Sequence, residues 1–498
     1  MFPSLIKKGK QGCSIIMNTK RKILLLNPPG DKLYLRDYYC SHTSNARYYW
    51  HPYDLLVQSG FLAQEHEVQA LDANVLGLTN EQALNRIKDM DIDTLFFLTG
   101  GVSWRNDFNF VTTVLKEKPA IKEVFSTGDF FLSRSVEMLE KYSFITAALL
   151  DFTSDVLLRY MRGELRGEKA DYITYRYNGR ILEGRRYTED KEFELPIQRL
   201  ELFPWREYRI PHGRYMPFAS TLTNFGCPFK CSYCVSSIVP LKLRKPENAV
   251  TEIEYLHKNF GIKEFWIKDY TFGVNKKHTI NFLNQLIAKN LNLSWVALSR
   301  VDVMDEDILK LMSKAGCHTI QFGVESVTDE ILKHYKKGVN PDQVRNIFRI
   351  CRENGIRTLA HFIIGLPGET LETAHKTVDF AKELLPDFVS FNIATPKMGT
   401  PFRKEAIDQG WTSSDIDVLD NSVAFPVVKT KELTPEQVWK LRNYAIRSYH
   451  LQLRFMWLRL SQVKTFYELN TLIREGIGLL SSTLRPMKQI PQESDAHV

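Results

Sequence analysis

A repeated strand–helix pattern in the second half of the chain limits its fold more than any other feature. From Phe218 onward, short apolar segments typical of buried strands alternate with helical segments about six times. The pattern begins at Phe218, and Leu222 and Thr223 lead into a loop that contains cysteines. Further strands are predicted at 264–269, 294–299, 319–326, 358–365 and 389–394, with helices such as 248–259 and 341–354 between them. Strands that alternate with helices pair in parallel. The pattern therefore predicts a partial (β/α)6 barrel over 215–425, with polar residues at the carboxyl ends of its strands facing one site.

A similar pattern lies upstream, in residues 22–155. Strands are predicted at 22–27, 67–71, 94–99, 123–129 and 147–152, and helices at 53–64 and 81–90. This alternation predicts an α/β domain with a doubly wound parallel sheet, whose ligands bind outside the carboxyl ends of the strands. The residues predicted at those ends are Asn27, Pro28, Asp72, Asn74, Gly100, Gly101, Ser103, Trp104, Ser126, Thr127 and Gly128. No G-x-G-x-x-G motif opens a helix here, so a dinucleotide site is disfavoured.

Three further regions complete the predicted organisation. Residues 1–21 form an N-terminal tail, and residues 156–214 form a connector with a β-hairpin within 171–185. Residues 426–498 form a helical C-terminal region, in which Thr434, Pro435 and Gln437 mark a helix start. Its segments 449–463 and 466–480 are basic and aromatic. We expect this region to cover the barrel, to line a channel for an apolar substrate, or to lie on a membrane.

Composition narrows the setting in which the chain works. Seven cysteines in 498 residues are too few for a secreted disulfide-rich protein, which favours a reducing, cytoplasmic setting. No run of 18 apolar residues is present, so no transmembrane helix is expected. A net charge of +8 suits anionic partners or simply a mildly basic enzyme. The basic residues of 162–185 and 242–245 are scattered, so no nucleic-acid partner is expected.

Three cysteines in one loop carry the chemistry that the sequence predicts. Cys227, Cys231 and Cys234 are spaced C-x3-C-x2-C in a segment rich in Gly, Pro and aromatic residues. Three neighbouring thiolates can hold three irons of a cubane [4Fe–4S] cluster and leave the fourth iron open to a small molecule. Buried thiols, a disulfide and a structural zinc are the alternatives. Zinc normally takes four protein ligands, and no cysteine or histidine follows closely enough to be the fourth.

The cysteine loop followed by the predicted barrel resembles the radical S-adenosylmethionine (radical SAM) enzymes, over residues from about 215 to 425. The resemblance implies that Cys227, Cys231 and Cys234 bind the cluster. SAM would bind the open iron and be cleaved reductively to a 5′-deoxyadenosyl radical that takes hydrogen from a substrate. The residues implied in SAM binding are Tyr233, Asp269, Arg300, Glu325, Ser326, Gly365 and Pro367. Those that follow the loop could instead serve ordinary packing of the barrel.

The upstream sheet makes the chain similar to the cobalamin-binding branch of that family, many of whose members are methyltransferases. The similarity implies that the strand-end residues of the N-terminal domain bind cobalamin. The sequence lacks the D-x-H-x-x-G motif that elsewhere supplies a histidine to cobalt, and Ser103 and Trp104 are the candidates for the lower cobalt face. The same absence admits a degenerate domain that binds no cobalamin.

These features lead to the hypothesis of a cobalamin-dependent C-methyltransferase that acts on an unactivated carbon of a small molecule. One SAM would methylate cobalamin and a second would supply the radical, with a flavodoxin or ferredoxin as reductant. The alternatives are a cyclase or rearrangement enzyme without methyl transfer, a radical SAM enzyme with a degenerate N-terminal domain, and a non-enzymatic cobalamin or iron–sulfur sensor. A methylthiotransferase is disfavoured, because Cys13 and Cys40 cannot form a second cysteine triad. The basic, aromatic tail favours a hydrophobic or lipid-like substrate and peripheral contact with a membrane.

Overall fold

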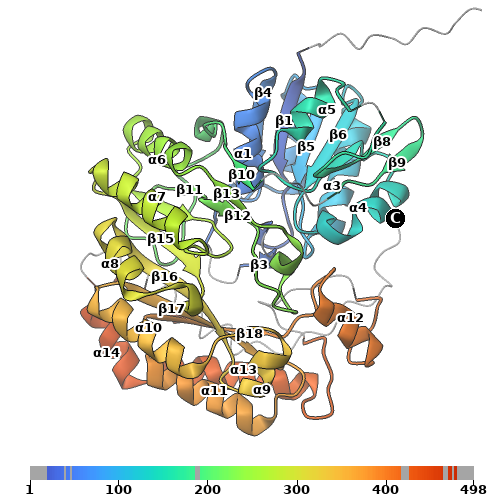
Figure 1. Cartoon of the computed structure of the whole chain (residues 1–498). Helices are drawn as coiled ribbons and strands as arrows, with labels where there is room; N and C mark the ends of the chain where they lie inside the picture. Colours follow the sequence, from blue (N-terminus) through green and yellow to red (C-terminus); the bar gives the residue numbers. More distant parts are fainter. Residues whose placement is uncertain are drawn as a thin grey trace, which may run out of the picture.

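The computed structural model describes residues 20–38, 41–44, 48–165, 167–185, 191–416 and 426–463, with short helical pieces at 469–470, 472–473 and 476–478. Within these ranges, an N-terminal sheet packs against an open barrel (Figure 1). The predicted N-terminal tail lies almost wholly outside the described residues, as do Cys13, Cys40 and most of the last 30 positions.

The N-terminal body is a seven-stranded sheet in the order β4-β1-β5-β6-β7-β8-β9. Its parallel strands are β1 (Lys22–Asn27), β4 (Glu67–Asp72), β5 (Thr94–Leu98), β6 (Glu123–Thr127) and β7 (Ala147–Leu149). The helices are α1 (Tyr53–Leu62), α2 (Asn80–Asp89), α3 (Trp104–Glu117), α4 (Phe131–Lys141) and α5 (Val156–Met161). The apolar run at 23–26 is completely buried, as expected for a parallel strand covered on both faces. The predicted doubly wound sheet is thereby confirmed.

The hairpin expected in the connector forms as β8 (Ile173–Tyr177) and β9 (Arg180–Leu182). It does not stand apart from the N-terminal domain, because β8 pairs antiparallel with β7 and so extends the same sheet. A second small pair, β2 (Tyr34–Leu35) and β3 (His42–Thr43), follows β1 and lies between the two bodies (Figure 1).

The second body is an open barrel of six parallel strands, which confirms the predicted (β/α)6 arrangement. In spatial order these are β11 (Phe218–Thr221), β14 (Glu264–Ile267), β15 (Ser294–Ser299), β16 (Cys317–Glu325), β17 (Arg357–Ile364) and β18 (Phe388–Ile393). Its outer helices are α6 (Pro246–Phe260), α7 (Lys276–Ala288), α8 (Glu306–Lys314), α9 (Asp329–His334), α10 (Pro341–Glu353) and α11 (Leu371–Leu384). The first strand ends at Thr221, and Leu222 and Thr223 lead from it into the cysteine loop, as the sequence indicates. Thr223 lies beyond the strand because its amide donates to Asp269.

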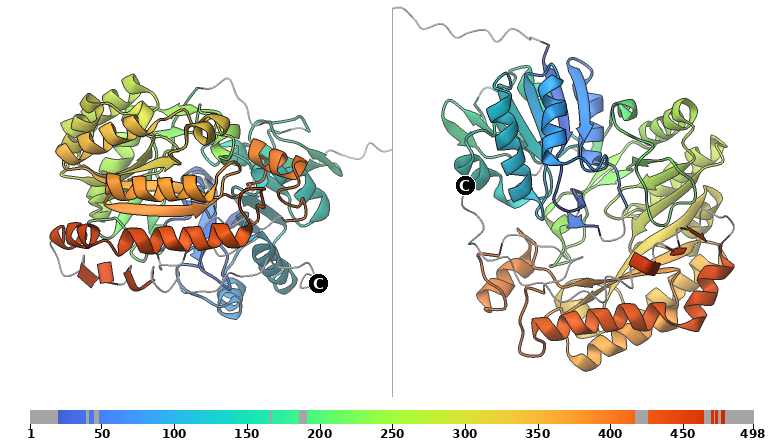
Figure 2. Two further views of the ribbon diagram at one scale, coloured as in Figure 1. Left: turned by 90° about the horizontal axis from the view of Figure 1, so that it is seen from below. Right: turned by 180° about the vertical axis from the view of Figure 1, so that it is seen from behind.

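The C-terminal region contains α12 (Pro401–Asp408), α13 (Pro435–His450) and α14 (Leu453–Ser461). Thr434 caps α13 in the predicted way, with a reciprocal capping box to Gln437. In the view from below, α13 runs alongside α11, and it buries Val438 and Trp439 against the barrel (Figure 2). Covering the barrel is therefore what this part of the C-terminal region does. None of the helices described is both long and apolar enough to cross a membrane.

One continuous hydrophobic core runs through both bodies and fixes how they meet. Tyr38 and Phe152 of the N-terminal body contact Phe225, two residues before Cys227, with ring centroids 5.1 Å apart in both cases. The carboxyl edge of the N-terminal sheet is thus packed next to the segment that begins the cysteine loop.

Candidate functional site

The cysteine loop is an excursion between two short strands. β12 (Asn224–Phe225) precedes it and β13 (Lys242–Arg244) follows it, and the two pair antiparallel. Gly226 opens the loop with a φ of +82°, and a Cβ at this position would lie 1.9 Å from the carbonyl oxygen of Pro240. Only glycine fits this turn. The turn places the three cysteines beyond the carboxyl end of β11.

The three thiols are free and their sulfurs face different partners. Cys227 Sγ lies 3.6 Å from Thr271 Oγ1, and Cys234 Sγ lies 2.9 Å from Ser236 Oγ. Cys231 Sγ accepts a hydrogen bond of 3.2 Å from Arg300 Nη1. Burial raises the pKa of the Cys234 thiol to about 11. A bound cation would reverse this preference for the neutral thiol, because a coordinating thiol loses its proton.

The surroundings of the loop fit a bound group. Four buried polar atoms close to it have no hydrogen-bond partner within the described residues: Asn224 Oδ1, Tyr233 Oη, Ser237 Oγ and Tyr335 Oη. Buried polar atoms are nearly always paired, so such a cluster is expected where a ligand supplies the missing partners. No three His, Cys, Asp or Glu side chains in the described part of the chain are grouped to hold a single metal ion. A cubane cluster takes each thiolate on a separate iron and needs no such grouping.

Asp269, predicted to contact SAM, is engaged inside the protein. Its carboxylate accepts four hydrogen bonds of 2.5 to 3.1 Å from the backbone and side chains of Thr223 and Asn224. Burial raises the pKa of this carboxyl to about 6. Because Thr223 and Asn224 immediately precede the loop, the contacts that Asp269 makes support an anchoring role for it at the start of the cysteine segment.

Arg300 and Glu325 each belong to an ion pair, and Arg300 lies beside Cys231. Arg300 makes a bidentate ion pair with Asp302, while Glu325 accepts from Lys337 Nζ at 3.0 Å. Glu325 has a φ of +70° at an irregularity in the β16–β17 register. A left-handed backbone at a non-glycine residue is costly and recurs at functional sites.

The remaining predicted SAM residues shape turns at the strand ends. Ser326 Oγ accepts from the amide of Thr328 at 3.2 Å. Gly365, with a φ of +88°, donates its amide to Glu369 Oε2 at 2.6 Å, and the buried Pro367 lies in the turn between them. Burial raises the pKa of Glu369 to about 7. Tyr233 lies near Tyr335, with their ring centroids 6.2 Å apart.

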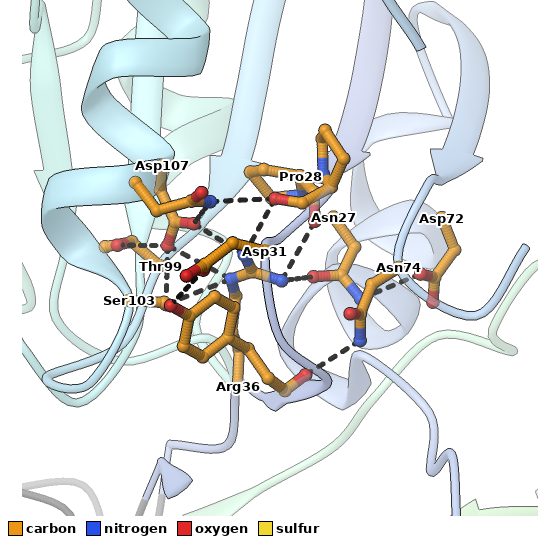
Figure 3. A network of polar contacts seen from close by, with 12 residues as sticks. Asn27, Pro28, Asp31, Arg36, Asp72, Asn74, Thr99, Ser103 and Asp107 are labelled. Carbon is orange, nitrogen blue, oxygen red and sulfur yellow. Dashed lines mark hydrogen bonds and ion pairs between the residues drawn. The ribbon is translucent and has the colours of Figure 1, made fainter. Parts of the chain in front are cut away.

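At the N-terminal sheet, a buried arginine occupies the carboxyl edge (Figure 3). Arg36 is paired with Asp107, and the side chains of both are completely buried. Its guanidinium also donates to Ser103 Oγ, Asn27 Oδ1 and the carbonyl of Pro28, at 3.0 to 3.1 Å. Asn27 in turn donates to Asp72 at 2.9 Å. Four of the residues predicted to bind cobalamin are therefore joined in one internal network.

The other predicted cobalamin residues are also committed within the protein. Asn74 donates to the carbonyl of Tyr34, and the hydroxyls of Ser126 and Thr127 donate to strand carbonyls. Around the three glycines the packing is close: a Cβ on Gly100 would lie 2.5 Å from Ser41, Gly101 donates its amide to Asp129, and a Cβ on Gly128 would meet the carbonyl of Thr99.

Trp104, a candidate for the lower cobalt face, begins α3, and its ring stacks on Phe130 in the core with the ring centroids 5.1 Å apart. Together with the network around Arg36, this shows that the strand-end residues already have partners within the protein, and their contact with cobalamin stays a prediction.

Sequence reasoning missed the tripeptide Arg36-Asp37-Tyr38, which joins three parts of the molecule. Arg36 binds the N-terminal sheet, Asp37 forms an ion pair with the buried Lys268 at the end of β14, and Tyr38 donates to the carbonyl of Leu150. The stretch is polar and without periodicity, so no local signal could have identified these contacts.

A model of the radical SAM superfamily matches residues 222–381. An uncharacterized methyltransferase of Pyrococcus horikoshii is 31% identical over 410 residues, which cover 80% of this chain and 88% of that protein. The chain belongs to the radical SAM superfamily. It is therefore an enzyme, and the cofactors of its superfamily are a [4Fe–4S] cluster and SAM.

Other similarities of this radical SAM enzyme are partial in sequence or restricted to the fold. The anaerobic magnesium-protoporphyrin IX monomethyl ester cyclase of Cereibacter sphaeroides is 34% identical over 218 residues, or 42% of this chain and 35% of that protein. A structure of the radical SAM methyltransferase TsrM from Kitasatospora setae, with cobalamin and a [4Fe–4S] cluster bound, matches with a TM-score of 0.67 at 18% identity. That match covers 92% of this chain and 99% of the other, so the two share their fold from the N-terminal sheet to the barrel.

Proposed function

We propose that this radical SAM enzyme is a C-methyltransferase whose cluster is held by Cys227, Cys231 and Cys234. The observation that carries the proposal is the group of three free thiols on one loop, with four buried polar atoms nearby that have no hydrogen-bond partner among the residues that the structure describes. When bound, the cluster and SAM supply a one-electron route to hydrogen abstraction from an unactivated carbon. Methyl transfer is supported by the relationship to the methyltransferase of Pyrococcus horikoshii.

The residues of the chain have two tasks in this proposal. Asp269 holds the start of the loop through four hydrogen bonds, which orients the thiols. Tyr233, Asn224 and Tyr335 each carry a buried polar atom without a hydrogen-bond partner in the described part of the chain, and we propose that these atoms contact SAM. Ser326, Gly365 and Pro367 keep the neighbouring turns in place, and the Glu325–Lys337 ion pair holds the end of β16 to the segment that contains Lys337. The substrate is a small molecule, and the reaction requires a reductant.

The decisive experiment is anaerobic reconstitution with iron, sulfide and a chemical reductant. The wild-type chain is expected to bind about four irons and to cleave SAM to 5′-deoxyadenosine. Cys231→Ala is expected to lose both properties. Cys351→Ala is the matched control, since Cys351 is a free, fully buried thiol outside the loop. Retention of the iron–sulfur absorbance in Cys231→Ala, or its loss in both variants, would contradict the assignment.

We further propose cobalamin as the second cofactor, supported by the fold shared with a cobalamin-containing methyltransferase. A second candidate, radical SAM chemistry without cobalamin, is favoured by the network of Arg36 over the strand ends. Reconstitution with hydroxocobalamin separates the two, because only the first predicts one cobalamin retained per chain after gel filtration. A cyclase or rearrangement enzyme would release 5′-deoxyadenosine and form no methylated product.

We also propose that α14 contacts a membrane surface or an apolar substrate. Leu453 is 81% exposed and Trp457 is 74% exposed, on a helix that also carries Arg454 and Arg459. Exposed apolar side chains flanked by basic residues suit an anionic lipid surface. Flotation with anionic liposomes is expected to recover the wild-type chain and not Leu453→Glu/Trp457→Glu. Equal recovery of both proteins would refute the membrane contact and leave only the contact with an apolar substrate, without affecting the assignment of the cluster.

A further inference from the structure

Arg300 directly follows β15, and several contacts within the protein hold its side chain in place. Its side chain is buried, and its Nε and Nη2 donate to the two carboxylate oxygens of Asp302 at 2.9 and 2.7 Å. Nη2 also donates to the carbonyl of Lys337. The guanidinium carbon lies 3.9 Å from the centroid of the Phe229 ring. Arg300 therefore has a single orientation, fixed from three sides.

That orientation directs Nη1 at the sulfur of Cys231, at 3.2 Å. With Nε, both hydrogens of Nη2 and one hydrogen of Nη1 engaged, four of the five N–H groups of the guanidinium are used inside the protein. The sulfurs of Cys227 and Cys234 instead contact hydroxyls, those of Thr271 and Ser236. Cys231 thus receives a charge-assisted hydrogen bond, which is stronger than one between neutral groups.

The backbone around the contact is held in the same way. The amide of Ser232 donates to the carbonyl of Tyr335 at 3.0 Å, and the Cys231 sulfur lies 3.6 Å from the carbonyl of Lys336. Arg300 donates to the carbonyl of Lys337, and Tyr335 in the same segment accepts from the amide next to Cys231. The segment 335–337 therefore links Arg300 to the backbone of Cys231. The N–H···S geometry is thus built by two segments of the barrel, not by a mobile side chain alone.

We propose that Arg300 is a positioning residue that sets the reduction potential of the cluster through the sulfur of Cys231. The inference deepens the proposed function and rests on Cys231 being a cluster ligand. A reduced cluster carries one more negative charge than an oxidised one, so a nearby cation and a hydrogen bond to a ligand sulfur stabilise the reduced form. Asp302 partly offsets this charge from the far side of the guanidinium. The role differs from the contact with SAM that the sequence suggests for Arg300.

The test is a potentiometric titration of the reconstituted enzyme, followed by the electron paramagnetic resonance signal of the reduced cluster. Arg300→Gln is expected to keep its iron and to shift the midpoint potential to more negative values. A tenfold fall in the equilibrium constant for reduction corresponds to about 59 mV for one electron. Arg300→Lys, which keeps the charge, is expected to fall between Arg300→Gln and the wild type. Arg345→Gln is the control, since Arg345 forms an exposed ion pair with Glu383.

Asp302→Asn supplies a measurement of opposite sign. Removing the carboxylate that offsets the charge of Arg300 is expected to shift the midpoint potential to more positive values. This variant tests the proposal on its own if Arg300→Gln fails to bind iron. Unchanged midpoints in iron-loaded Arg300→Gln and Asp302→Asn would overturn the proposal. A large rise in the Kd for SAM in Arg300→Gln, with an unchanged midpoint potential, would also overturn the proposal, because Arg300 would then serve as a SAM contact. Absence of iron from the wild-type chain would refute the proposed function itself.

Discussion

Replacement of Arg36 by methionine tests whether the buried network holds the edge of the N-terminal sheet together. Both Arg36 and Asp107 have fully buried side chains, and Asp107 also accepts from Thr99 and Ser103 at 2.8 and 2.7 Å. Loss of the guanidinium leaves a buried carboxylate without its cation and deprives Asn27 Oδ1 and the Pro28 carbonyl of a donor. Removal of one partner of a buried ion pair costs about 3–5 kcal/mol.

This cost should appear locally, in β1 and β5. A loss of 3–5 kcal/mol corresponds to amide hydrogen exchange faster by about two to three and a half powers of ten, since each 1.4 kcal/mol is a factor of ten. Peptides from β16 and β17 serve as the internal reference, measured by mass spectrometry on the intact chain. The double variant Arg36→Met/Asp107→Leu, which removes both charges, is expected to recover most of the protection.

The control is Arg345→Met, whose ion pair with Glu383 is exposed and is expected to change stability by less than about 1 kcal/mol. The reasoning would be refuted if Arg36→Met changed exchange in β1 and β5 by less than tenfold. An equal acceleration in β17 would also refute it, because the destabilisation would then not be centred on the edge of the sheet.

Three further predictions follow from single contacts. Gly226→Ala should prevent iron incorporation, because its Cβ would meet the carbonyl of Pro240 at 1.9 Å; normal iron content would show that the loop can relax. Burial raises the pKa of Asp269 from 3.8 to about 6, so the folded chain binds this proton more tightly than the unfolded chain. The contribution of Asp269 to the free energy of unfolding is then highest below pH 3.8 and is lost as pH rises towards 6, a dependence that should be absent in Asp269→Asn when unfolding is measured across that range. Thr434→Ala removes the cap of α13 and should destabilise it by about 1 kcal/mol, seen as faster exchange in its first turn and not in α11.

Much of the architecture follows from short-range patterns. The apolar run of β1 and the strand–helix alternation after residue 218 predict the two sheets, because periodicity and burial act over a few neighbouring residues. The spacing of Cys227, Cys231 and Cys234 likewise predicts a cluster site from the residues of a single loop. The same local rules predict the cap of α13 from Thr434 and Gln437.

The partners of the charged side chains were decided only by the tertiary structure. Asp269 binds Thr223, 46 positions away, and Arg300 reaches Cys231 across 69 positions. Arg36 pairs with Asp107 across 71 positions. It lies at the carboxyl edge of the N-terminal sheet, where the sequence predicts contacts with a cofactor. Lys268 meets Asp37 across 231 positions. Such contacts depend on strand order and loop conformation, which no local pattern of residues encodes. The sequence therefore determined which chemistry the loop can hold, and the packing of the two bodies decided which side chains are free to take part in it.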